Sequence, residues 1–152
     1  MQKHDFYQSL VKQTESLIGG ESNIIANMAN ISALLFTSLE DVNWAGFYFM
    51  DSPTELVLGP FQGNPACIRI PVGKGVCGTA AATEQTQLIS DVHAFDGHIA
   101  CDAASNSEIV VPIMKNGCVF AVLDIDSPSI GRFDTDDQAG LEALVKCLEA
   151  SL

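Results

Sequence analysis

The hydrophobic period of the chain changes from helical to β near Asn43, and this change constrains the fold more than any other feature. Upstream of it, residues 4–18 predict a first helix, which Gly19-Gly20 would end. The expected apolar side of this helix consists of Phe6, Leu10 and Leu17.

A second helix is expected to begin at Ser22 or Asn23. Its apolar positions repeat at helical spacing, and such a stripe normally faces the core, so we interpret Met28 as a core residue. The stripe consists of Ile24, Met28, Ile31 and Leu35.

Downstream of Asn43, short apolar runs alternate with turn residues and predict strands. A loop over residues 73–78 would lead into a short helix that runs through Thr83. The segment 91–107 has no clean period, and a long irregular segment that contains Asp, His and Cys favours a functional loop. The expected strands are 44–50, 55–61, 66–71, 87–90, 108–114 and 118–126.

Asp134 should cap a last helix, because acidic residues follow it in the first helical turn. The buried stripe of this helix would be Leu141, Leu144, Val145 and Leu148. Consecutive strands look linked by hairpins, and 115–117 is one such turn. The element order therefore predicts an α+β fold in one domain over residues 1–152, with a largely antiparallel sheet of about six strands covered by helices.

The net charge of −12 excludes whole classes of partner. A nucleic-acid binder needs Lys and Arg on one face, and an anionic membrane surface would repel this chain. Residues 1–20 contain no apolar signal region, and no run is long enough to span a membrane. We expect a cytoplasmic protein with reduced cysteines and no cofactor.

Three carboxylates should converge at one end of the predicted 108–126 hairpin. Asp124 and Asp126 lie two residues apart on one strand, so their side chains share a face, and Glu108 opens the neighbouring strand. Mutual repulsion and burial would raise at least one pKa, and a carboxyl protonated near neutral pH can donate a proton. The alternative is that Asp126-Ser127-Pro128 is an ordinary turn.

Trp44 and Tyr48 also share a strand face, because they lie four residues apart. Aromatic residues at such positions are normally core. The alternative is an aromatic wall for a small apolar or sulfur-containing ligand.

The five cysteines fall into two groups. Cys118 and Cys147 lie in apolar patterns and are expected to be inert core residues. Cys67, Cys77 and Cys101 have turn-rich, polar surroundings, which suggests thiol chemistry. Short zinc-ligand spacings are missing, so no metal site is predicted, although a scattered site with His93 or His98 stays open as a minor alternative. Lys74 lacks the rest of a phosphate-loop pattern and is interpreted as part of a turn.

Several runs together make the chain closely resemble the free methionine-(R)-sulfoxide reductase family, whose fold is a GAF domain. A generic GAF domain shares the layout but not the three cysteines. Ala121 is a departure, since glycine is expected there. The matching runs are 43–48, 59–63, 66–67, 73–78, 91–93, 97–102, 105–111 and 122–127.

The resemblance implies a role for each candidate. Cys101 would be the nucleophile, Cys67 the resolving cysteine and Cys77 a further redox partner or alternative resolver. The active-site acids would be Glu108, Asp124 and Asp126, and the substrate pocket would include Trp44 and Tyr48.

The reaction implied by the resemblance is reduction of free methionine-(R)-sulfoxide through a cysteine sulfenic acid and an intramolecular disulfide, which thioredoxin resets. The family also implies a homodimer and a role in oxidative stress. The alternatives are a GAF sensor that binds a small molecule without catalysis, and a small zinc protein.

Overall fold

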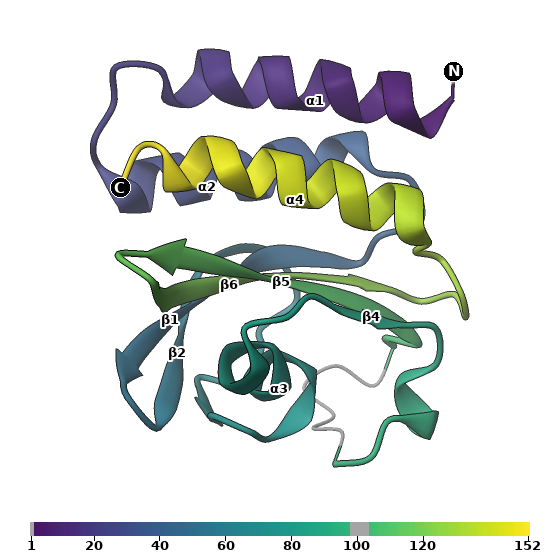
Figure 1. The fold of residues 1–152 in the computed structure, drawn as a ribbon. Helices are drawn as coiled ribbons and strands as arrows, with labels where there is room; N and C mark the ends of the chain where they lie inside the picture. Colours follow the sequence, from purple (N-terminus) through teal and green to yellow (C-terminus); the bar gives the residue numbers. More distant parts are fainter. Residues whose placement is uncertain (1, 98–103) are drawn as a thin grey trace.

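The computed structural model describes residues 2–97 and 104–152. Helices occupy both ends of this chain, and strands occupy most of its middle (Figure 1). The helices are α1 (Lys3–Ile18), α2 (Ile24–Ser38), α3 (Gly75–Thr83) and α4 (Thr135–Glu149), with a 3-10 turn at Val92–Ala94. The strands are β1 (Trp44–Ser52), β2 (Glu55–Gly63), β3 (Arg69–Pro71), β4 (Gln87–Ile89), β5 (Ser107–Lys115) and β6 (Cys118–Ser127).

The strands form one six-stranded sheet in the order β3-β2-β1-β6-β5-β4, and every neighbouring pair is antiparallel. The predicted α+β class is therefore confirmed. The β5–β6 hairpin turns at Asn116 and Gly117, whose φ angles of 53° and 78° are the left-handed values that such two-residue turns need. Two strands are shorter than predicted. β3 covers three residues instead of 66–71, because the chain before Arg69 lies outside the strand ladder, and β4 ends at Ile89, one residue before the predicted end.

One face of the sheet is covered by α2 and α4, and α1 packs on the outer side of these two helices (Figure 1). The apolar core lies between them and the sheet. Met28, Ile31 and Leu35 are fully buried there, which confirms the predicted stripe of α2. The four residues predicted for α4 are also buried. Ala121, on the same face of β6, is fully buried.

The predicted apolar side of α1 was partly wrong. Leu17 is 43% exposed, whereas the buried residues are Tyr7, Leu10, Thr14 and Ile18. The side of α1 that is buried depends on its neighbouring helix. α1 packs mainly on α4, where Gly140 makes room for the Tyr7 ring. A Cβ atom at Gly140 would lie 2.1 Å from Tyr7 Cγ.

Side-chain caps define the starts of α2 and α4. Asn23 accepts a hydrogen bond from the Ala26 amide, and Asp134 forms a capping box with Asp137. Asp137 is 1% exposed and also accepts hydrogen bonds of 2.7 Å from the Tyr7 hydroxyl and the Lys3 ammonium group. The start of α4 is therefore linked to α1 through one buried carboxylate.

The opposite face of the sheet carries α3 and the connections on either side of it (Figure 1). A second apolar cluster lies under α3, where Val76 and Ala80 pack with Val110 and Val122 of the sheet. Candidate site residues gather on this face. Among the described residues, no helix has the length and apolar character that a membrane span requires.

Candidate active site

The strand register brings the three predicted acids together. Asp126 pairs with Glu108 of β5 on one side and with Trp44 of β1 on the other. Asp124 lies two residues earlier on β6, on the same face and opposite Val110. This arrangement confirms the predicted convergence, and the alternative that Asp126 is only a turn residue is wrong, since β6 continues through Ser127.

All three acids are buried although they carry ionisable groups. The exposed fractions are 8% for Glu108, 5% for Asp124 and 9% for Asp126. Asp124 Oδ1 has no hydrogen-bond partner among the described residues. Buried polar atoms are normally satisfied, so this oxygen marks a position where a ligand group or water is expected to bind.

Burial and crowding change the acidity of this cluster. Burial raises the pKa of Glu108 well above its ordinary value, and the neighbouring Asp124 and Asp126 carboxylates raise it further. Burial also raises the pKa of Asp124, although hydrogen bonds from Glu108 and Cys77 oppose this shift. The site therefore holds a carboxyl that keeps its proton at a pH where an exposed glutamate has lost it.

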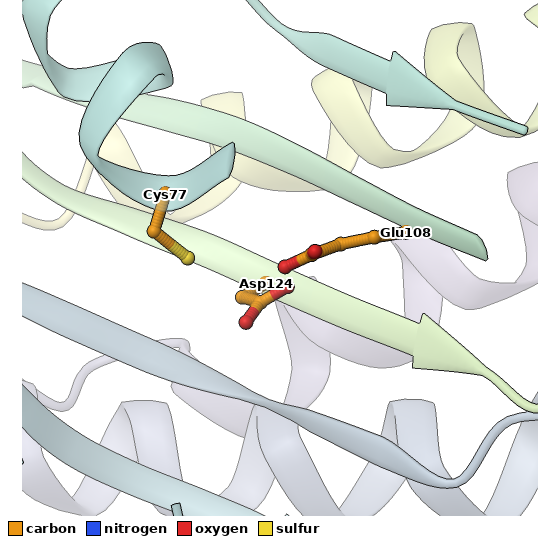
Figure 2. Close-up of side chains that lie close together, drawn as sticks. All are labelled: Cys77, Glu108 and Asp124. Atoms are coloured by element: carbon orange, nitrogen blue, oxygen red, sulfur yellow. The ribbon is translucent and has the colours of Figure 1, made fainter. Parts of the chain in front are cut away.

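Cys77 lies beside these acids in the first turn of α3. Its sulfur and one oxygen each of Glu108 and Asp124 lie within 4.8 Å of one another (Figure 2). The expectation of polar, turn-rich surroundings was wrong for Cys77: the residue is 5% exposed and packs in the apolar cluster under α3. Burial raises the pKa of its thiol, and the Asp124 and Glu108 carboxylates add to this shift. Cys77 is therefore a protonated, weakly nucleophilic thiol at neutral pH.

An aromatic wall borders the acids on the β1 side. The rings of Trp44 and Phe61 stack with centroids 5.1 Å apart, and Tyr48 follows Trp44 at 6.0 Å. Trp44 and Tyr48 are buried, which confirms the core interpretation, and both also line the pocket. Gly46 makes this packing possible, because a Cβ atom there would lie 2.2 Å from Phe61 Cβ.

The two aromatic donors of this wall hold the segment that contains Cys67. The Trp44 indole donates to the carbonyl of Asn64 (3.0 Å), and the Tyr48 hydroxyl donates to the carbonyl of Cys67 (2.8 Å). Cys67 is half-buried and disulfide-bonded. Cys101, the predicted nucleophile, and His98 lie outside the described residues.

The remaining cysteines differ from expectation in their burial. Cys118 is exposed at the first position of β6, and Cys147 is half-buried at the edge of the core, so neither is a core residue. Both positions lie near the end of an element, where an apolar pattern alone does not show which residues the neighbouring elements cover. Both are free thiols, as is Cys77.

His93 and Lys74 take no part in the acid cluster. His93 forms a 2.9 Å hydrogen bond with Asn106, and Lys74 precedes the first residue of α3, as a turn residue would. Among the described residues, the potential ligand atoms that come together belong to Cys77, Glu108 and Asp124. In the described part of the chain, Cys77 therefore lies next to two carboxylates, and a cysteine–histidine zinc site is not formed around it.

Some residues that line the pocket between the acids, the aromatic wall and α3 were not predicted as site residues from the sequence. Their signals were weak, because each is a small or apolar residue of ordinary type. Ala66, Gly75 and Val76 lay within the matching runs, and Ser105 began another. The lining consists of Trp44, Tyr48, Ala66, Ile70, Gly75, Val76, Cys77, Ser105, Glu108, Asp124 and Asp126.

The arrangement combines a proton donor, negative charge and an apolar wall in one pocket. A protonated carboxyl can transfer a proton to a basic oxygen of a ligand, and an ionised neighbour can bind an ammonium group. The aromatic rings suit a methyl or thioether group. Such a pocket suits a small ligand that has a basic oxygen, an ammonium group and a short apolar end.

Comparisons with known proteins identify the family of the chain. The family model of the GAF domain matches residues 4–152. The chain is 57% identical to the free methionine-R-sulfoxide reductase of Escherichia coli, over 100% of this chain and 92% of that protein.

Two solved structures of substrate complexes share the fold. One is that of the fRMsr of Staphylococcus aureus (TM-score 0.92, 55% identity, 96% of this chain and 95% of that chain). The other is the free methionine-R-sulfoxide reductase of Neisseria meningitidis (TM-score 0.95, 43% identity, 99% of this chain and 90% of that chain). The chain belongs to the free methionine-(R)-sulfoxide reductase family of GAF-domain proteins.

Proposed function

We propose that this protein reduces free L-methionine-(R)-sulfoxide to L-methionine. The observation that carries the proposal is the buried acid cluster beside an aromatic wall, with the pKa of Glu108 raised well above its ordinary value. Relatives that are named for this activity, two of them solved with substrate, support the choice of substrate.

The acids solve the main chemical difficulty of the reaction. A sulfoxide sulfur is a poor electrophile until its oxygen is protonated. In the proposal, the protonated Glu108 carboxyl donates this proton, which general acid catalysis makes worth roughly 10²–10⁴-fold in rate. An ionised neighbour, Asp124 or Asp126, binds the substrate ammonium group. The methyl end of the substrate would lie against Trp44 and Tyr48.

The electrons come from thiols. The sulfur of Cys101 attacks the protonated sulfoxide sulfur, the oxygen is transferred to Cys101, and methionine leaves with its sulfur reduced. Cys101 is then a sulfenic acid, and the Cys67 thiol displaces its hydroxyl group, which forms a disulfide and releases water. The role of Cys101 rests on the family resemblance, and the disulfide-bonded state of Cys67 supports its place in the cycle.

Cys67 is proposed as the first resolving cysteine in preference to Cys77. The burial and raised pKa of Cys77 leave little thiolate at neutral pH, so Cys77 would attack a sulfenic acid slowly. Cys77 would then serve as an alternative resolver. A dithiol protein of the thioredoxin type would reduce the disulfide by exchange, and the resemblance further suggests a homodimer.

The experiment mixes the fully reduced protein with free L-methionine-(R)-sulfoxide, without another reductant, and counts methionine and thiols together. The proposal expects the loss of a pair of thiols for each methionine formed, and no product from the Cys101→Ser variant. Cys118→Ser, which removes an exposed thiol at a strand end, is the matched control and should react normally. Saturable binding of the sulfoxide without any methionine would contradict the proposal and indicate a sensor.

A further inference from the structure

The segment from Asn64 to Ile68 connects β2 and β3 without belonging to either strand. Gly63 ends β2 with a φ of 131°, and a Cβ atom there would lie 2.7 Å from Trp44 Cδ1. Glycine therefore lets the chain leave the sheet directly beneath the indole ring. Asn64 and Pro65 are exposed, and Cys67 is half-buried.

This segment lies outside the strand ladders, and side chains of β1 hold it near both ends. Trp44 Nε1 donates to the Asn64 carbonyl at 3.0 Å, and Tyr48 Oη donates to the Cys67 carbonyl at 2.8 Å. The two donors are 2% and 1% exposed and lie four residues apart on the same face of β1. Because the donors are fixed in a sheet, the carbonyls that they bind are fixed too.

Regular pairing resumes only after Cys67. The amide of Leu58 donates to the carbonyl of Ile68 at 2.9 Å, and the β2–β3 ladder follows from Arg69. Between Gly63 and Ile68, the Tyr48 hydroxyl is thus one of the groups that hold the backbone of Cys67 in place.

We propose that Trp44 and Tyr48 act as a clasp, defined as the pair of hydrogen bonds to the Asn64 and Cys67 carbonyls, which positions Cys67 for disulfide closure. The inference rests on the proposed function of Cys67 as the resolving cysteine. It gives both aromatic residues a role beyond the pocket wall: they are positioning residues for the second thiol.

The physical reason is proximity. Closing a disulfide from two cysteines of one chain is fast and favourable in proportion to the time that their sulfur atoms spend within reach. Without the clasp, the Asn64–Ile68 segment samples more conformations, and the effective concentration of the Cys67 thiol falls. A typical net contribution of one hydrogen bond corresponds to about 2- to 10-fold in such an equilibrium.

The chain offers a matched pair of variants, since its two tyrosines both donate to an oxygen from buried positions. Tyr48→Phe removes the hydroxyl that holds Cys67 and keeps the ring. Tyr7→Phe removes a hydroxyl that donates to Asp137, on the far side of the sheet. Trp44→Phe is a second test variant, because it removes the donor to Asn64 and keeps an aromatic ring.

The experiment equilibrates each protein with mixtures of reduced and oxidised dithiothreitol and measures the fraction of protein disulfide by thiol alkylation. Tyr48→Phe and Trp44→Phe should each shift the equilibrium constant about 2- to 10-fold toward the dithiol. Tyr7→Phe should lower the melting temperature and leave the constant unchanged. Circular dichroism checks folding, and Trp44→Phe carries the test if Tyr48→Phe does not fold.

A second readout follows the reaction itself. After one addition of sulfoxide, a sulfenic acid trap should label the Tyr48→Phe protein more than the wild type, since closure competes less well with trapping. Equal disulfide constants and equal trapping in wild type and both test variants would overturn the clasp. Absence of methionine from the wild type would instead contradict the proposed function, while the dithiothreitol equilibrium would still report on the clasp.

Discussion

Glu108→Gln should have a higher free energy of unfolding than the wild type, and this difference should grow as the pH rises. The same substitution should slow the reaction. In the folded protein, burial and the neighbouring Asp124 and Asp126 raise the pKa of Glu108, so it keeps its proton. In the unfolded chain, a glutamate loses its proton near pH 4.3, which is about the ordinary value. Above that pH the folded state binds more protons than the unfolded state.

This difference sets the sign and size of the effect. In the wild type, the contribution of Glu108 to the free energy of unfolding must fall as the pH rises from its unfolded-state pKa toward its folded-state pKa. For one excess proton, the fall is at most about 1.4 kcal/mol per pH unit. This destabilisation of the folded wild type is absent below the unfolded-state pKa of Glu108 and grows above it. From about pH 5 to about pH 7, the bound is therefore about 2.7 kcal/mol. Glutamine has no proton to lose, and Glu108 is only 8% exposed, so solvent screening reduces the effect little.

The assay is urea unfolding of the oxidised protein at several pH values, followed by the fluorescence of Trp44, the single tryptophan. The difference in unfolding free energy between Glu108→Gln and wild type should increase with pH over this range, by no more than about 2.7 kcal/mol. Turnover should fall by roughly 10²- to 10⁴-fold. Glu40→Gln, at an exposed glutamate, is the control and should follow the wild type. Parallel pH dependence of Glu108→Gln and wild type would refute the reasoning.

Three further predictions concern packing and hydrogen bonds, and urea unfolding measures each of them. Gly46→Ala should cost more than about 2 kcal/mol and shift the Trp44 emission, because the added Cβ would lie 2.2 Å from Phe61 Cβ; unchanged stability and emission would show that the strands yield easily. Asp137→Asn should cost about 2–4 kcal/mol, since the Tyr7 hydroxyl and Lys3 ammonium group lose a buried charged acceptor. A loss under about 0.5 kcal/mol, the low end for a single hydrogen bond, would speak against that carboxylate as the link between α1 and α4. Asn23→Ala should cost about 1 kcal/mol through the lost cap of α2, whereas Asn23→Gly should cost less, and the reverse order would count against the cap.

The sequence predicted the parts of this fold that depend on local period. Apolar spacing identified the core sides of α2 and α4, and alternation with turn residues identified the strands, because these patterns reflect which side of an element is covered. The convergence of Glu108 with Asp124 and Asp126 was predictable too, since one hairpin turn determines the register of both strands.

The errors arose where burial depends on elements that are distant in the sequence. Leu17 looked like a core residue of α1, but the contact with α4 selects Tyr7 and Ile18 instead. Cys77 was expected in polar, turn-rich surroundings, yet α3 folds over the sheet and buries it beside Asp124. The two hydrogen bonds from β1 to Asn64 and Cys67 had no sequence signal, because indole and hydroxyl donors reach backbone carbonyls whatever the residue type.

Product formation from the two epimers of methionine sulfoxide shows whether this pocket reduces one epimer of a free amino acid. The purified protein, with a dithiol as reductant, is given the R and S epimers of methionine sulfoxide, each as the free amino acid and within a short peptide, and methionine is quantified. We expect methionine from the free R epimer, with the other three substrates at background. Equal turnover of the peptide substrate, or turnover of the S epimer alone, would contradict this expectation.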